Sequence, residues 1–130
     1  MKVQIVRIAD RGVPTKERLH LRAEADVDIG QYLVFHTGFV APDSTNIATP
    51  PKHVFWFRAS VIKAGDNVVL YTTRVGLASS EERPDGGKNH FFYWGLPQPV
   101  WADQEQCATV LEIKDWATTK REVSDTPAVH

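Results

Sequence analysis

The shortness of the apolar runs is the feature that most constrains how this chain of 130 residues folds. Most of these runs alternate with polar residues, are rich in Val, Ile, Phe, Tyr and Thr, and are separated by clusters of Gly, Pro, Asn and Asp. Alternation with a period of two is typical of β-strands, and such clusters are typical of turns. The pattern therefore predicts an all-β domain.

The clearest alternation runs from residue 17 to residue 28, which we predict to be one strand. Its apolar residues are spaced by two: Leu19, Leu21, Ala23, Ala25 and Val27. Successive side chains of a strand point to opposite faces, so we expect one face of this strand in the core and the other in water. Further strands are predicted at residues 3–8, 32–37, 54–59, 68–74 and 90–94.

Two segments are too polar or too rich in proline for regular structure. Residues 41–53 contain three prolines, and proline cannot donate a hydrogen bond to a strand ladder. Residues 76–89 include a polar, turn-forming stretch from Ser79 to Gly87. We predict a long surface loop for the first segment and a mobile hairpin loop for the second. Whether these loops become ordered on binding is left open by the sequence.

Residues 103–117 fit both a helix and a strand. Asp103 with Gln106 resembles a helix capping box, and Cys107, Val110 and Leu111 would share one helical face. In the strand interpretation Cys107, Leu111 and Ile113 share one face, and the β-branched residues of the segment suit a sheet. Periodicity alone leaves both alternatives open.

The length of the chain is close to the usual size of one domain. We expect residues 1–116 to form that domain and residues 117–130 to be a polar, frayed C-terminal tail. Cys107 is the only cysteine, which excludes an internal disulfide and a zinc site built from several cysteines. Because it lies in an apolar stretch, we interpret Cys107 as a small core residue and not as a nucleophile.

Charge and hydropathy narrow the classes of partner. Fifteen basic and sixteen acidic side chains give a formal net charge of −1, without the basic excess that nucleic acids select for. Nucleic-acid binding is therefore disfavoured, although a local basic patch is compatible with this balance. No apolar run approaches the roughly 20 residues that span a bilayer, so no integral membrane protein is expected. The first residues do not resemble a signal peptide, which predicts a cytoplasmic location.

Histidines are the candidate metal ligands, but they are spread along the chain. His20 and His36, with Asp26 or Asp28, would supply the imidazole and carboxylate groups that metals bind. We favour the alternative of two solvated histidines, because nothing in the spacing converges on one point. No phosphate-binding loop, metalloprotease helix or nucleophile-elbow motif occurs. The sequence thus predicts no cofactor, no metal and no catalytic residue.

Aromatic residues are concentrated in the second half of the chain, and four are consecutive from Phe91 to Trp94. On a strand, one pair of them must face the core and the other pair either a second layer or solvent. An exposed pair would stack on sugar rings, bases or the apolar groups of a partner, whereas covering loops would remove that role. The candidate interaction surface predicted from the sequence comprises His90, Phe92, Trp94 and Trp116.

The segment VIKAGDNVVLYT, residues 61–72, resembles the lamin tail domain, as do Tyr93-Trp94-Gly95, Pro99-Val100-Trp101 and residues 108–111. The resemblance covers about residues 17–116. It implies an immunoglobulin-like β-sandwich of mostly antiparallel strands, in which residues 107–113 form a strand. It implies no catalysis, because lamin tail domains generally act as interaction or tethering modules.

Three functional hypotheses follow from these patterns. The first is a non-catalytic protein-interaction module that binds an unidentified protein partner or forms a homo-oligomer. The second is a module that binds carbohydrate or single-stranded nucleic acid on the outward aromatics of residues 90–94. The third, which we favour least, is a small metal-dependent or hydrolytic enzyme that uses His20 and His36.

Overall fold

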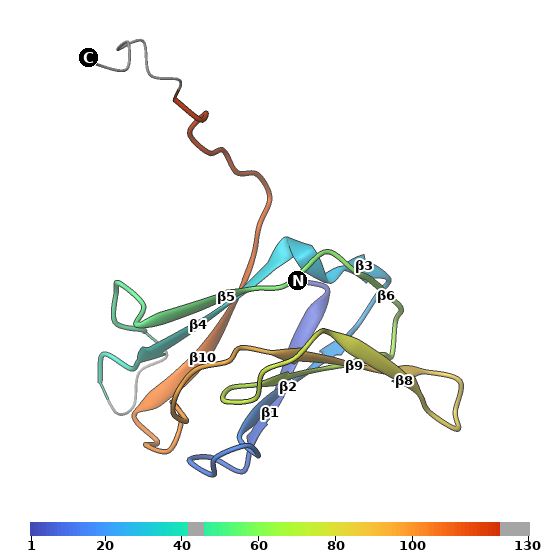
Figure 1. Ribbon diagram of the computed structural model, residues 1–130, viewed down its shortest axis with the longest axis horizontal. Coiled ribbons are helices and arrows are strands. Elements are labelled where there is room, and N and C mark those ends of the chain that lie inside the picture. Colours follow the sequence, from blue (N-terminus) through green and yellow to red (C-terminus); the bar gives the residue numbers. More distant parts are fainter. Residues whose placement is uncertain (42–45, 123–130) are drawn as a thin grey trace, which may run out of the picture.

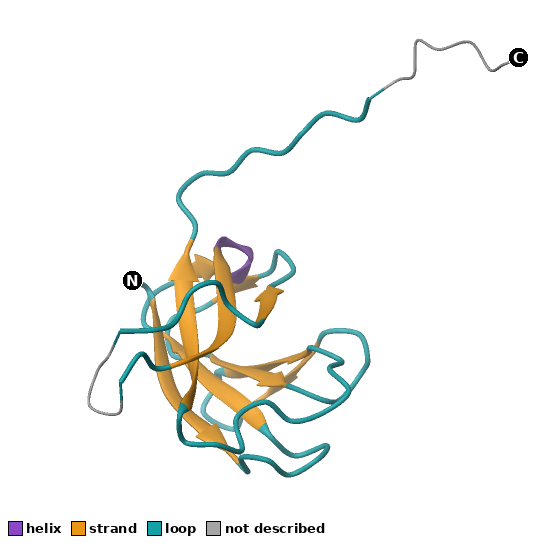
Figure 2. Cartoon of the chain, turned by 90° about the vertical axis from the view of Figure 1, so that its left-hand side faces the viewer, coloured by secondary structure: helices purple, strands orange, loops and turns teal. Residues whose placement is uncertain are grey.

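The computed structural model describes residues 1–41 and 46–122, and its regular secondary structure is almost entirely strand (Figures 1 and 2). In these residues the one helical element is a single 3-10 turn, η1 (Ile29–Gln31). The strands are β1 (Val3–Ala9), β2 (Arg18–Ala23), β3 (Val27–Asp28), β4 (Tyr32–Gly38), β5 (His53–Trp56), β6 (Val61–Ile62), β7 (Asn67–Tyr71), β8 (Ser79–Glu82), β9 (Lys88–Tyr93) and β10 (Gln106–Glu112). No helix in the described part of the chain is long and apolar enough to cross a membrane.

Two sheets form a sandwich. The first has five strands in the order β1-β2-β7-β9-β8, and the second has three in the order β10-β4-β5. A short ladder of β3 with β6 accompanies them. Every pair of strands is antiparallel except β7 with β9, which run parallel. The structure therefore confirms the predicted all-β sandwich of mostly antiparallel strands.

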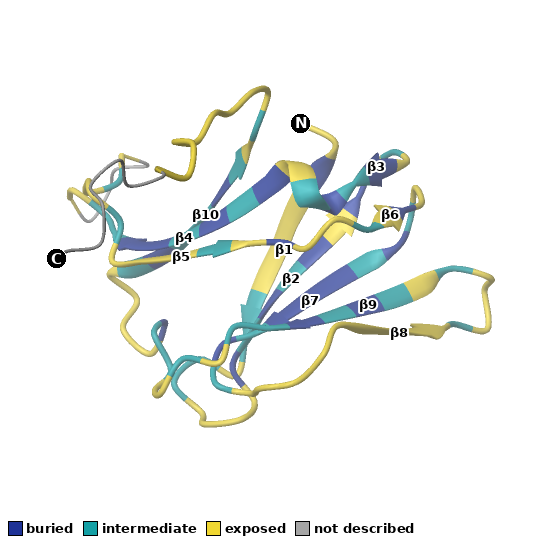
Figure 3. Cartoon of the chain, turned by 45° about the horizontal axis from the view of Figure 1, so that its top comes forward, coloured by how far each residue is buried: buried dark blue, intermediate teal, exposed yellow. Residues whose placement is uncertain are grey.

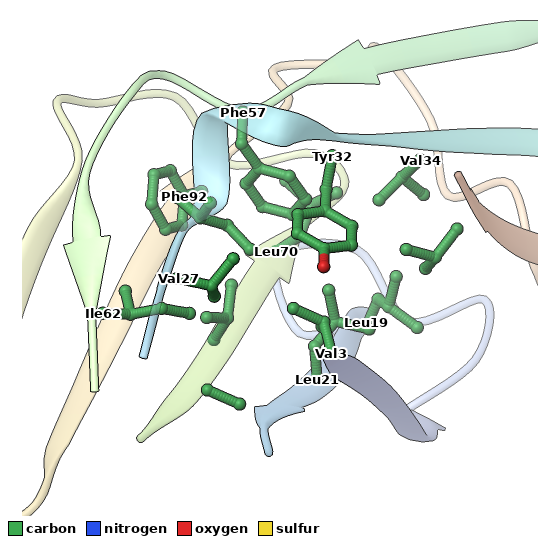
Figure 4. Close-up of a cluster of buried hydrophobic side chains, with 14 of the residues drawn as sticks. Val3, Leu19, Leu21, Val27, Tyr32, Val34, Phe57, Ile62, Leu70 and Phe92 are labelled. Atoms are coloured by element: carbon green, nitrogen blue, oxygen red, sulfur yellow. The ribbon is translucent and has the colours of Figure 1, made fainter. Parts of the chain in front are cut away.

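The core lies between the two sheets and follows from the alternation of their sequences (Figure 4). The inward residues of β2 and β7 include Leu19, Leu21 and Leu70, each fully buried. Opposite them, β4 contributes Tyr32 and Val34. Burial of each large apolar side chain contributes about 1.5–3 kcal/mol to folding. This inner layer is the principal source of stability.

The prediction of one strand from residue 17 to residue 28 was wrong in its continuity. β2 ends at Ala23, and the chain then leaves the five-stranded sheet to pair through β3 with β6. The carboxylate of Asp26 accepts a hydrogen bond from the backbone N–H of Ala64 within the break. Leu19, Ala23 and Val27 are nevertheless all buried, as the alternation predicted, because the interruption is short.

The segment of residues 76–89 contains a strand that its polar composition concealed. β8 pairs antiparallel with β9, so these residues form part of a regular hairpin at the edge of the sheet. Arg83 stabilises the turn by donating hydrogen bonds to the backbone carbonyls of Gly65 and Lys88. An edge strand exposes both faces to water and therefore does not need apolar residues.

The other predicted loop, residues 41–53, corresponds to the connection between β4 and β5 except for its last residue, which belongs to β5. Phe39 and Ile47 form an isolated antiparallel bridge, and β5 starts at His53. Residues 42–45 lie outside the described residues, as do residues 123–130. Residues 117–122 are exposed and contain neither helix nor strand.

The ambiguity of residues 103–117 is resolved in favour of a strand. β10 pairs with β4 over seven consecutive residue pairs, from Gln106 opposite Gly38 to Glu112 opposite Tyr32. Asp103 accepts a hydrogen bond from the backbone N–H of Glu105, as in a turn rather than a helix cap. The ladder supplies long-range hydrogen bonds that outweigh a local capping preference.

Glu17 joins three segments at one end of the sandwich. Its side chain is 1% exposed, and its two carboxylate oxygens accept four hydrogen bonds of 2.8–2.9 Å. The donors are the backbone N–H groups of Gly12, Val100 and Trp101 and the hydroxyl of Thr72. A buried carboxylate is tolerated when hydrogen bonds replace its hydration, and here three of the four donors come from distant segments.

We expect Glu17→Ala to lower the free energy of unfolding by at least about 3 kcal/mol, because three backbone N–H groups lose their acceptor in the interior. Chemical denaturation monitored by circular dichroism measures this change. Glu24→Ala, at an exposed position of the following turn, is the matched control and should change stability by less than about 0.5 kcal/mol. Equal effects of the two substitutions would contradict the role assigned to Glu17.

Candidate functional site

The four residues of the predicted interaction surface do not lie on one surface. His90 and Phe92 point inward from β9 and are 8% and 4% exposed. Trp94 is half-buried and packs against the core and against Trp101. Trp116 is 63% exposed, beyond the end of β10. Only Trp116 therefore presents most of its side chain to a partner.

The outward pair of the aromatic strand is Phe91 and Tyr93. Both are half-buried and lie on the outer face of the five-stranded sheet, where the ring of Tyr93 stacks on that of Tyr71 with 5.8 Å between centroids. No second layer of strands packs on this face within the described residues. Phe91 and Tyr93 thus point outward and Phe92 points inward, as the alternation of side chains along a strand requires.

The outer face of the three-stranded sheet is apolar. Residues that alternate with the buried ones on β4, β5 and β10 point away from the core. We call the following set the apolar face: Leu33, Phe35, Val54, Trp56, Thr109 and Leu111. None of its members is charged, and each is at least partly exposed (Figure 3). Polar or charged residues would be expected on a face that contacts only water.

Two tryptophans mark one end of the apolar face. Trp56 is 47% exposed and its indole N–H donates to the backbone carbonyl of Gly30 at 2.8 Å. The ring of Trp116 meets it edge-on with 5.4 Å between centroids. A hollow of about 130 Å³ lies beside Trp116 and Ile113. The hydrogen bond and the ring contact hold both indoles in place while they remain open to solvent.

A pair of histidines joins β4 to β5 at the end of their ladder that is opposite to Trp56. Nδ1 of His36 lies 2.9 Å from Nδ1 of His53, and Nε2 of His36 lies 2.8 Å from Oε1 of Gln106. Because Oε1 accepts only, Nε2 of His36 carries its proton, and Nδ1 of His36 accepts from His53. Burial above all, together with the nearby His53 and Lys52, lowers the pKa of His36, which keeps it neutral.

The hypothetical metal site of His20 and His36 is not assembled. His20 points outward from the five-stranded sheet, whereas His36 points inward from the other sheet. The carboxylate of Asp28 instead caps η1 and accepts from the backbone N–H groups of Gly30 and Ser60. Among the described residues, no group of three or more His, Cys, Asp or Glu side chains is arranged to hold a metal ion.

His90 forms a buried pair with Asp66. Nε2 of His90 lies 2.9 Å from Oδ2 of Asp66. Burial raises the pKa of Asp66, but hydrogen bonds from His90 and from the backbone N–H groups of Lys63 and Lys88 outweigh burial and hold it below its ordinary value. No serine hydroxyl of the described residues hydrogen-bonds to His90. The pair therefore connects the turn before β7 to β9 and has no nucleophile bound to it.

Comparison with known protein families and with curated proteins found no match to this chain. The resemblance to the lamin tail domain accordingly stays a prediction from the sequence. The geometry offers binding surfaces: the apolar face on one side of the sandwich and the outer face of the five-stranded sheet on the other.

The apolar face was missed at the level of the sequence, although a signal for it exists. Residues 32–35 and 54–57 are apolar at consecutive positions, so both faces of these strands carry apolar side chains. Strands of this kind are typical of sheets covered on both sides.

We expect the free energy of unfolding to decrease as the pH falls from about 7 to about 5. The pKa of His36 is lower in the folded chain than in the unfolded chain, where it is about 6.5, so the stabilisation is complete above that pH and declines below it. Denaturation of His36→Gln over the same range should show a shallower slope, since glutamine does not titrate. Parallel slopes in the two proteins would contradict this assignment.

Proposed function

We propose that this protein is a non-catalytic interaction module that forms a homodimer through its apolar face. The observation that carries the proposal is the absence of charge from all six residues of that face, combined with their exposure. Contiguous exposed apolar patches are uncommon on monomers and mark surfaces that another molecule covers. A role as an interaction module in the cytoplasm is also what the sequence and its resemblance to lamin tail domains lead us to expect.

The energetics favour burial of this face. Removal of apolar surface from water contributes about 25 cal/mol per Å². Tryptophan is enriched among residues whose truncation costs most at interfaces, and Trp56 and Trp116 are already positioned by local contacts. Little side-chain entropy is then lost on association.

A second copy of the chain is the occupant that the surface fits best. In a two-fold dimer each patch meets an identical patch, so any charge near the axis would meet a like charge. The apolar face avoids such repulsion because its central residues are neutral. Sheets pack face to face about 10 Å apart through side chains of this type, as the two sheets of the monomer already do.

We expect Val54→Lys to convert the dimer into a monomer, because each interface would bury two unpaired ammonium groups. Sedimentation velocity across a range of concentrations measures the change in mass. Val61→Lys is the matched control: Val61 is 68% exposed but lies on β6, outside the apolar face, and this variant should remain dimeric.

Two outcomes would overturn the homodimer. The first is a wild-type protein that stays monomeric at the highest soluble concentration. The second is a dimer that Val54→Lys leaves intact or that Val61→Lys dissociates equally. A monomer that acquires one heterologous protein on the same face would replace the second copy with that partner and would likewise reject the homodimer.

A further inference from the structure

The outer face of the five-stranded sheet carries its side chains in rows across the strands. One row runs from Arg18 through Tyr71 to Tyr93. The next runs from Arg7 through His20 and Val69 to Phe91, and the third from Arg22 through Asn67 and Asn89 to Glu81. In each row an arginine lies on β1 or β2, and two rows have aromatic rings further across.

The arginines form a stripe along β1 and β2, which we call the arginine stripe: Arg7, Arg18 and Arg22. Arg18 and Arg22 are four residues apart on one strand and thus about 13 Å apart along it. Arg18 pairs with Asp10 at 2.7 Å. Arg7 and Arg22 are exposed, and no ion pair engages either within the described residues. Two of the three guanidinium groups therefore have free donors.

The rings form a second stripe along β7 and β9, the aromatic stripe: Tyr71, Phe91 and Tyr93. The guanidinium of Arg74 lies over the ring of Tyr71 at 4.6 Å from its centroid and over that of Tyr93 at 5.9 Å. The ring of Tyr71 also has Arg18 above it at 5.9 Å. The two tyrosine rings are thus engaged by each other and by arginines, and Phe91 is the ring of the stripe that is left to receive a base.

A hollow of about 230 Å³ extends over β2, β7, β9 and β8, and Glu81 on β8 is the carboxylate among its lining residues. His20 and Phe91 line it, and the carboxamides of Asn67 and Asn89 lie at one end, joined by a hydrogen bond of 3.0 Å. Nε2 of His20 is buried and has no hydrogen-bond partner among the described residues. Burial first, and then the charges of Arg18 and Arg7, lower the pKa of His20. A neutral imidazole and two carboxamides therefore supply polar groups beside the rings.

We propose that this face binds single-stranded nucleic acid, with phosphates on the arginine stripe and a base on Phe91 of the aromatic stripe. A nucleic acid strand has its charge on one side and its flat rings on the other, and the two stripes reproduce that division. Proteins that bind single strands combine a basic track with rings on which successive bases stack. The near-zero net charge of the chain does not oppose this, because the positive charges are local.

Other anionic ligands fit this face less well. A duplex hides its bases in grooves that a flat sheet face does not enter, so the aromatic stripe would find no partner. A sulfated glycan would satisfy the arginines, but its sugar rings lack the π-face that a base would place over Phe91. Among the described positions of the three rows the single carboxylate is Glu81, on the edge strand β8, which is the strand furthest from the arginine stripe.

Fluorescence anisotropy with a labelled oligothymidylate of twelve nucleotides tests the proposal. Neutralisation of two phosphates, by Arg7 and Arg22, predicts that the logarithm of the binding constant falls with the logarithm of salt concentration with a slope of about −1.4. Arg22→Glu should weaken binding at least about tenfold at low salt and make the slope shallower by about 0.7. Phe91→Ala should weaken binding roughly tenfold and leave the slope unchanged.

Arg58→Glu is the matched control, because Arg58 is also exposed, lies outside the five-stranded sheet, and makes the same change in net charge. It should bind the oligonucleotide as the wild type does. Thermal unfolding of each variant separates loss of binding from loss of the fold. The Arg22→Glu protein, altered at an exposed side chain, keeps the test valid if Phe91→Ala unfolds.

Three results would overturn the proposal. They are no binding to the oligonucleotide at low salt, equal losses for Arg22→Glu and Arg58→Glu, and equal affinity for the single strand and its duplex. A heparin oligosaccharide that binds where the oligonucleotide does not would assign the face to an anionic glycan instead. Because the variants lie outside the apolar face, each result is independent of dimer formation.

Discussion

The buried carboxylate of Glu17 is the interaction on which one end of the sandwich depends. It lies at the end of the β1–β2 connection, and its donors come from that connection, from the residue after β7 and from the segment before β10. Its hydrogen bonds to Val100 and Trp101 place the indole of Trp101 in the interior, next to Trp94 and His36. One acidic side chain thereby aligns three irregular segments, because its two oxygens accept hydrogen bonds from donors that would otherwise be unpaired.

The two sheets are alike inside and different outside. Both inner faces are mainly apolar, as a shared core requires, and give no information about function. The outer face of the three-stranded sheet is uncharged and presents Trp56, whereas that of the five-stranded sheet presents arginines beside Tyr71 and Phe91. The first favours an apolar protein surface and the second a charged ligand with flat rings. Because the faces point in opposite directions, both can be occupied at once.

Residue-level patterns predicted most strands, but they failed where pairing with a neighbouring strand decides whether a segment is a strand. The parity of Leu19 and Leu21 was predictable from alternation alone, and the burial of Phe92 is one of the two arrangements that alternation allowed. β8 was not predictable, because Ser79–Glu82 has no apolar residue and becomes a strand by pairing with the free edge of β9. The predicted interaction surface failed for a similar reason. The aromatic character of His90 and Phe92 does not indicate which side of the sheet they occupy.

The sequence by itself determined the class of fold, the approximate strands and the absence of an internal disulfide, because a period of two is a local property of neighbouring residues. Tertiary structure alone decided which strands are neighbours and which faces stay uncovered. The row from Arg18 through Tyr71 to Tyr93 joins residues more than fifty positions apart, and the bond from Glu17 to Trp101 spans 84. Such contacts depend on strand order and register, which arise from the packing of the whole chain and not from any one segment.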